Sequence, residues 1–183
     1  MDAAPAGFLQ PIPSAWTFVL LAVLVLGAAS DLRRAKIPNW LTYSAMAAGL
    51  LLHTAQHGVA GLSRSAGGLA VGIALFLAFY LLGGMGAGDV KFMGAVGSLL
   101  GLSGVLSAAF VTALLGGAYA VVAAIRHWGV GTGVQRIVSL FLAWALMGRL
   151  RLALAPPETQ PKLRYGVVIA IGTVVAQWWT GRL

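Results

Sequence analysis

The acidic side chains are the residues of this sequence best suited to catalysis, and there are few of them. The 183 residues contain four acids, which are Asp2, Asp31, Asp89 and Glu158. Asp89 follows a glycine-rich stretch and lies between two long apolar runs. Because a charge in or near a lipid bilayer is energetically costly, an acid in such a place is by default a functional hypothesis. Asp89 is therefore the first candidate catalytic residue.

Asp31 is the candidate partner of Asp89 in aspartyl proteolysis. When two carboxyl groups share one proton, the ionised group can activate water while the protonated group donates its proton to the peptide. Such chemistry needs no metal and no nucleophilic side chain. The sequence has no cysteine, which excludes a thiol nucleophile, a disulfide framework and a thiolate zinc site.

Both acids also have purely structural interpretations. Asp31 can form an interface ion pair with Arg33 or Arg34, since charges are common beside membrane helices. Asp89 can cap the N-terminus of a helix. The sequence alone leaves both kinds of interpretation open.

The glycines before Asp89 have two interpretations as well. Gly83, Gly84, Gly86 and Gly88 can adopt positive φ angles and allow a substrate backbone to approach closely. The Gly84-x-x-x-Gly88 spacing is also that of a helix-packing motif. In the first interpretation, a flexible glycine-rich turn carries the catalytic Asp.

Two histidines have a spacing that can bind metal. His53 and His57 occupy positions i and i+4, as the two histidines of a zincin helix do. The glutamate that acts as general base in such helices is missing, and no third ligand is evident. We predict neither a metal site nor a cofactor.

The composition predicts an integral membrane protein. Hydrophobic residues make up 60% of the chain and charged residues 9%, whereas about a quarter of the residues in a soluble domain are charged. The net charge of +8 comes from basic residues between apolar segments, without the interleaved aromatics of a nucleic-acid-binding stripe. The expected partner of these basic residues is a lipid bilayer, and no nucleic acid is expected.

The apolar segments predict an all-α fold, a compact bundle of about six transmembrane helices, some of them short, in one domain over residues 1–183. Residues 1–16 contain no Lys or Arg, so the first apolar run is expected to be a retained helix and not a signal peptide. A polar loop is expected over residues 53–65, and an interfacial or re-entrant helix over residues 137–147. The predicted spans are residues 17–30, 40–53, 66–82, 90–102, 105–125 and 165–179.

Small residues mark the fourth of these spans. Gly94, Gly97, Gly101 and Gly104 recur at helical spacing, which suits close helix packing better than lipid exposure.

The basic residues predict the orientation in the membrane. If the N-terminus is outside, only Arg64 and Arg182 lie on the outer side. The other ten basic residues then lie on the cytoplasmic side, as the positive-inside rule requires. They are Arg33, Arg34, Lys36, Lys91, Arg126, Arg136, Arg149, Arg151, Lys162 and Arg164. This layout places Asp31 and Asp89 at the same, cytoplasmic face.

Three stretches of the chain resemble the type IV prepilin peptidase family, whose members are GxGD-type intramembrane aspartyl peptidases. The first is Ser30-Asp31 followed by Ile37-Pro38-Asn39-Trp40-Leu41-Thr42, and the second is Gly84-Met85-Gly86-Ala87-Gly88-Asp89-Val90-Lys91. The third, residues 164–172, resembles the family's third block, although Arg164 stands where proline is expected. The resemblance covers most of the chain in the family's order.

The resemblance implies roles for individual residues. Asp31 and Asp89 would be the catalytic pair. The residues implied to shape the loop or bind substrate are Gly86, Gly88, Lys91, Pro38, Asn39, Tyr165 and Gly166.

The resemblance also implies an activity and a location. The family removes the basic leader of prepilins and pseudopilins at the cytoplasmic face of the bacterial inner membrane, and the pilus assembly machinery is a candidate partner. Its bifunctional members carry an N-terminal cysteine cluster that this sequence lacks. The chain is therefore similar to the minimal, peptidase-only form of tight-adherence pilus systems, and no N-methyltransferase activity is expected.

Two other classes of function fit parts of the sequence. In a small proton- or ion-coupled transporter, Asp31 and Asp89 would relay ions, although such acids usually lie near the membrane midplane. In an assembly scaffold, the glycines would only pack helices. Exchange of both acids for asparagine would then be tolerated.

Overall fold

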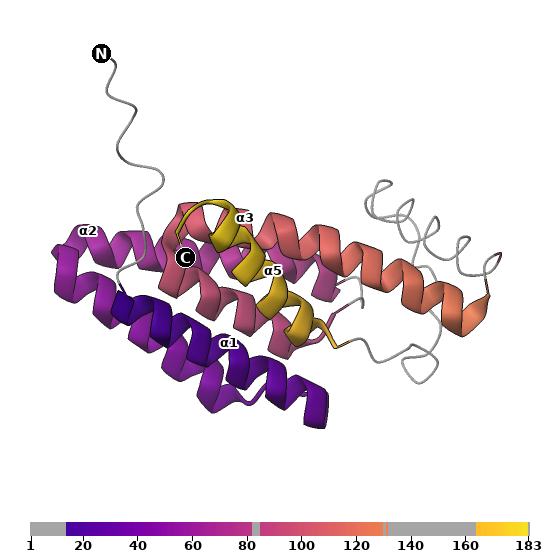
Figure 1. Cartoon of the computed structure of the whole chain (residues 1–183). Coiled ribbons are helices and arrows are strands. Elements are labelled where there is room, and N and C mark those ends of the chain that lie inside the picture. The colour runs from indigo at the N-terminus through magenta and orange to yellow at the C-terminus, as the bar shows by residue number, and fades with distance from the viewer. Residues whose placement is uncertain (1–13, 82–84, 130, 132–163, 183) are drawn as a thin grey trace, which may run out of the picture.

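The computed structural model describes residues 14–81, 85–129, 131 and 164–182, and all regular structure in these residues is α-helical. The helices are α1 (Ser14–Arg34), α2 (Asn39–Leu81), α3 (Ala87–Trp128) and α5 (Tyr165–Trp179) (Figure 1). The predicted all-α fold is thus confirmed for the described residues. Residues 137–147 lie outside them.

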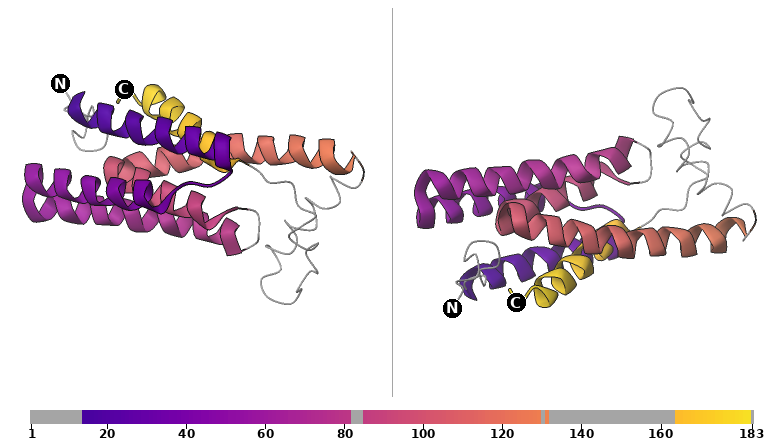
Figure 2. Two further views of the ribbon diagram at one scale, coloured as in Figure 1. Left: turned by 90° about the horizontal axis from the view of Figure 1, so that it is seen from below. Right: turned by 90° about the horizontal axis from the view of Figure 1, so that it is seen from above.

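Two of the helices fold back on themselves at a single glycine. Gly58 in α2 has φ 57° and ψ −138°, and Gly101 in α3 has φ 69° and ψ −175°. Glycine reaches such angles without the steric penalty that a Cβ atom brings. Gly97 lies against the side chain of Val105 across the Gly101 turn, a contact that a straight helix cannot make over eight residues. Figures 1 and 2 show both reversals.

The polar loop expected over residues 53–65 is not present. These residues are helical, and the change of direction occurs at Gly58 alone. Polar side chains such as Gln56 and His57 are poorly suited to a bilayer core, but they are compatible with helical backbone. Their presence therefore did not signal the end of a helix.

Within the described ranges, three helices are long and apolar enough to cross a membrane, judged by length and composition. The apolar segments are Trp16–Arg34, Asn39–Leu81 and Ala87–Ala123, and Tyr165–Trp179 is a shorter apolar helix. A spanning helix needs about 20 residues, and the two folded-back helices each contain about twice that number. The count of about six spans stays a prediction.

The first half of α3 forms the centre of the bundle. Phe92, Met93, Ala95 and Val96 are fully buried. Gly97 contacts the backbone of Gly68 in α2, so the two helices touch without intervening side chains. Because lipid competes equally well for apolar side chains, such close van der Waals packing is what holds membrane helices together. Gly94 and Gly97 of the predicted small-residue face therefore pack on α2 as expected, whereas Gly101 forms the reversal and Gly104 lies beyond it.

The remaining two helices complete the bundle. α5 packs against α3 and α1, with Gly172 against Thr112 of α3. α1 approaches α3 where Gly27 lies against the ring of Phe92. α1 ends and α2, α3 and α5 begin at one end of the bundle, which we call the acid end because it carries Asp31 and Asp89 (Figures 1 and 2). The opposite end, with Gly58 and Gly101, is called the turn end.

Candidate active site

Asp31 lies in the last turn of α1 and is 4% exposed. The helix ends at Arg34, and the next residue, Ala35, has a left-handed φ of 49° and donates its N–H to the Asp31 carbonyl oxygen (2.9 Å). This geometry closes the helix and turns the chain toward α2. Asp31 is thus held at the acid end by the way α1 terminates.

Gly166 of α5 packs directly against Asp31. A Cβ atom on Gly166 would lie 2.9 Å from the Cβ of Asp31 and 3.0 Å from its Oδ2. The absence of a side chain therefore allows the N-terminus of α5 to approach the acid. The backbone N–H groups of Gly166 and Val167 face the carboxyl group. N–H groups in the first turn of a helix have no intrahelical acceptor, so they are available to a neighbouring carboxylate.

Asp89 lies in the first turn of α3 and is 8% exposed. Its Oδ2 accepts a hydrogen bond from the Gly86 N–H (3.2 Å), while its own N–H donates to the Gly86 carbonyl oxygen (3.1 Å). The capping role considered for Asp89 is therefore present. A carboxylate has two oxygens, so this cap leaves Oδ1 for other chemistry.

The two acids lie close enough for the charge of Asp31 to act on Asp89. Ile37 lies near the segments that support both acids. Its backbone and Cβ lie 3.7 Å from the position of a Cβ on Gly88, and its Cδ1 lies 2.9 Å from that of a Cβ on Gly166. The two acids are therefore electrostatically linked, as a catalytic pair of carboxyl groups must be.

The ion pair considered for Asp31 is not seen. Arg33 and Arg34 are exposed, and the basic residue that acts on the Asp31 charge is Arg164, immediately before α5. In the described part of the chain, Oδ2 of Asp31 is buried and accepts no hydrogen bond. Its surroundings are therefore not those of a solvated interface charge.

The prediction of positive φ angles was wrong for Gly86 and Gly88. Gly86 has φ −80° and ψ 149°, and Gly88 is in the first turn of α3. Gly83 and Gly84 lie outside the described residues. A Cβ on Gly88 would meet Ile37 at an ordinary 3.7 Å, so the described fold does not require glycine there. Helix α3 begins so early that ordinary angles suffice at both positions.

Lys91 and Asn39 are brought together although 52 residues separate them. The Lys91 Nζ donates to the Asn39 Oδ1 (3.0 Å) and lies 5.1 Å from the centre of the Tyr43 ring. Pro38 precedes Asn39, and its carbonyl oxygen accepts from the N–H groups of Leu41 (3.1 Å) and Thr42 (3.4 Å). Pro38 therefore supplies the first carbonyl acceptor of α2, and Asn39, the first residue of the helix, accepts a hydrogen bond from the lysine of α3.

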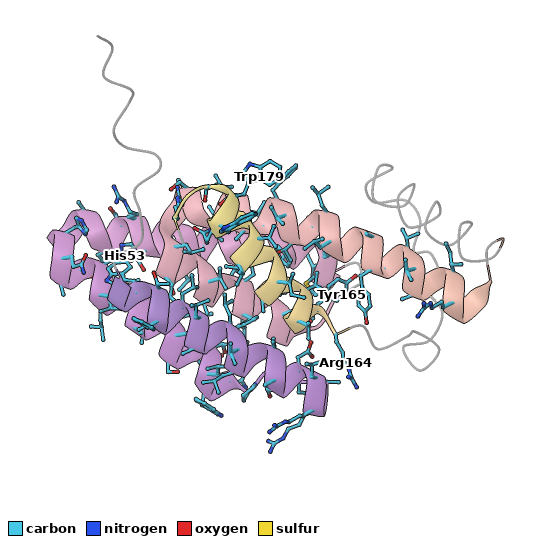
Figure 3. The ribbon with its side chains drawn as sticks, viewed as in Figure 1. His53, Arg164, Tyr165 and Trp179 are labelled. Carbon is cyan, nitrogen blue, oxygen red and sulfur yellow. The ribbon has the colours of Figure 1, made fainter. Side chains whose placement is uncertain are left out.

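Tyr165 is the first residue of α5 and lies near enough to Asp89 to be influenced by its charge. Its ring meets that of Tyr119 edge to face, with centroids 6.3 Å apart. Figure 3 shows Arg164 and Tyr165 where α5 begins, and His53 toward the opposite end of the bundle.

Two residues at this site were not singled out from the sequence. They are Tyr119 and Ile37, of which only Ile37 was noted as part of the Ile-Pro-Asn motif. Nothing in the local sequence of Tyr119 indicates its contact with Tyr165. For Ile37, the motif itself was the available signal.

His53 lies away from the acids and is 5% exposed. Its Nε2 is 3.1 Å from the Leu99 carbonyl oxygen, and its ring packs edge to face on Trp16 with centroids 4.2 Å apart. The described residues contain no group of three or more side chains that could hold a metal ion. These contacts are those of a buried packing residue.

The acids, their helix ends and the Ile-Pro-Asn connector fall within one family match. Residues 18–121, more than half of the chain, match the model of the type IV leader peptidase family. The match includes Asp31 and Asp89 and ends before Tyr165 and Gly166. No curated protein and no solved structure matches the chain. On the strength of the family match, the chain belongs to the type IV leader peptidase family.

Proposed function

We propose that this protein is a membrane-embedded aspartyl endopeptidase with Asp31 and Asp89 as its catalytic pair. The observation that carries the proposal is that both acids are buried at the same end of the bundle, one in the last turn of α1 and the other in the first turn of α3. Family membership supports peptidase activity. Both carboxyl groups are buried against helix termini, which restricts their orientations.

The reaction requires one ionised and one protonated carboxyl group. The ionised group takes a proton from water as the water oxygen attacks the scissile carbonyl carbon, and the protonated group donates its proton to the carbonyl oxygen. In the second step the C–N bond of the resulting gem-diol breaks as the nitrogen accepts a proton from the protonated carboxyl group, and the ionised one takes a proton from a diol hydroxyl, so the pair again holds one proton. The two acids titrate as a unit, so neither role is assigned to one of them at rest.

The proposed substrate is a type IV prepilin or pseudopilin, cut between its basic leader and its apolar helix. An apolar substrate helix would lie in the bilayer beside the peptidase, and its leader would emerge at the acid end. The absence of cysteine supports a peptidase without N-methyltransferase activity. The pilus assembly machinery is a proposed further partner.

The acid end is proposed to face the cytoplasm of a bacterial inner membrane. Arg33, Arg34, Lys36 and Arg164 are all exposed at or beside this end, whereas Arg64 is exposed near Gly101 at the turn end. An excess of basic residues marks the cytoplasmic side of a membrane protein. Acids near one end of the helices also fit a peptidase better than an ion-coupled transporter, whose sites usually lie near the midplane.

Cleavage of a co-expressed prepilin tests this proposal. Wild-type protein is expected to release the leader, while Asp31→Asn and Asp89→Asn slow release by about 10²-fold or more, the typical contribution of a general acid or base. Abundance in the membrane is matched by immunoblotting. Arg126→Gln, which removes an exposed charge from α3, is the control and is expected to cleave normally. Normal cleavage by either Asp variant would show that the acid it lacks is not catalytic.

A further inference from the structure

The ammonium group of Lys91 contacts side chains of α2 and not the nearby carboxyl group of Asp89. The residue lies in the second turn of α3, two positions after Asp89. Its Nζ donates to the Asn39 Oδ1 and lies over the ring of Tyr43, one turn further along α2. A hydrogen bond from an ammonium group is stronger than one between neutral groups, and the aromatic face adds a second attraction.

This contact joins the two chain segments that carry the acids. Asn39 is the first residue of α2 and follows Asp31 through a connector of four residues, 35–38. Lys91 follows Asp89 on the same helix. Movement of the α3 N-terminus away from the connector would therefore have to break the contact between Lys91 and Asn39.

Ile37 supports the same junction from within. It is 8% exposed and packs closely against Gly166, next to Asp31, while its Cβ lies 3.7 Å from the position that a Cβ on Gly88, next to Asp89, would take. Ile37 thus limits how closely α5, which packs on Asp31, approaches the connector, while the contact of Lys91 with Asn39 limits how far the start of α3 separates from it. Together they define one spacing for the two carboxyl groups.

We infer that Lys91 is a positioning residue that clasps the start of α3 to Asn39 and so sets the separation of Asp31 and Asp89. The inference rests on the proposed function, because the separation matters only if the acids act together. Reacting groups must be held in a near-attack geometry, and a displacement of about 1 Å can lower a rate by about 10²-fold. Lys91 itself touches neither carboxyl group in the proposed reaction.

Steady-state kinetics on a prepilin peptide test the effect on catalysis. Lys91→Met is expected to lower kcat by about 10- to 100-fold with little change in KM, because the acids are misplaced while the substrate surface is intact. Lys91→Arg retains a cation able to reach Asn39 and is expected to restore most of the rate. Arg126→Met, the same kind of change elsewhere on α3, is expected to have no effect.

A double substitution identifies the partner of Lys91. Asn39→Leu is expected to match the loss seen with Lys91→Met, and the double variant is expected to be no slower than either single variant. If the double variant is slower than either single variant by the product of their separate losses in rate, Lys91 and Asn39 do not act through their contact with each other.

A distance measurement distinguishes a positioning role of Lys91 from a role in substrate binding. The chain has no native cysteine, and Lys36 and Ala87 are exposed on the connector and at the start of α3. Spin labels at Lys36→Cys and Ala87→Cys are expected to give a narrow distance distribution that broadens or lengthens with Lys91→Met and not with Arg126→Met. An unchanged distribution, or a loss confined to KM, would overturn the inference. This readout needs no activity, so it tests the clasp even if the proposed peptidase reaction fails.

Discussion

Gly166 shows how much of this site depends on single residues. It lies in the first turn of α5, and the position of a Cβ there is occupied by Asp31 and Ile37. The location of Asp31 and Asp89 at one end of the bundle could be predicted from the sequence, because the positive-inside layout places both acids at the same face of the membrane. The contact with Gly166 could not, since it depends on the packing of α5 against the end of α1, which local sequence does not encode.

Gly166→Ala is therefore expected to impair both activity and stability. The added methyl group must displace Asp31 or α5, and overpacking of this kind costs about 1–3 kcal/mol in the free energy of unfolding. Thermal unfolding in detergent and the prepilin cleavage assay measure the two effects. The control is Gly117→Ala on α3, where a Cβ would meet nothing within 4 Å. Equal behaviour of the two variants would contradict the close approach of α5 to Asp31.

At the scale of secondary structure elements, the form of the reversal in α2 was harder to predict than the helices themselves, whereas the break expected between residues 102 and 105 lies close to the reversal at Gly101. The apolar runs indicated the helices correctly. Residues 53–65 were expected to form a loop, because the polarity of that region was taken as a break in the helix. Polarity marks where a chain leaves a bilayer, whereas the reversal requires one residue at positive φ. Gly61, Gly67 and Gly68 lie nearby, and sequence alone does not single out Gly58.

Substitution of two glycines in α2 tests this account of the reversal. A Cβ would meet nothing within 4 Å at either Gly58 or Gly67, but only Gly58 has a positive φ. Gly58→Ala is expected to lower the free energy of unfolding by about 1–3 kcal/mol through backbone strain, and Gly67→Ala is expected to lower it little or not at all. Thermal unfolding of both variants in one detergent makes the comparison. If both substitutions are equally harmless, the reversal does not depend on the backbone angles of Gly58.

At the scale of the whole molecule, the C-terminal end of α1 and the N-terminal ends of α2, α3 and α5 lie at one end of the bundle. Hydropathy and charge predicted this common end, because each apolar segment crosses the membrane in the direction opposite to that of the segment before it. Neither feature could predict which side chains meet there. The contact of Lys91 with Asn39 and the position of Ile37 depend on helix packing over more than fifty residues of sequence.

Accessibility measurements test the proposed orientation of the whole molecule. Arg34 and Arg64 are both exposed, and no native cysteine interferes with labelling. In intact cells, an impermeant thiol reagent is expected to label Arg64→Cys and to leave Arg34→Cys unlabelled until the inner membrane is permeabilised. The reverse pattern would place the acid end outside and contradict the proposed cytoplasmic site.

The most direct test of the central claim is the rate of prepilin cleavage by Asp31→Asn, Asp89→Asn and the double variant, compared with wild type at equal abundance. Groups that act as one catalytic unit lose nearly all of their effect when either is removed. We therefore expect each single variant to lose about 10²-fold or more in rate, and the double variant to be no slower than the single ones. Normal cleavage by either single variant, or losses that multiply in the double variant, would contradict a shared-proton pair of Asp31 and Asp89.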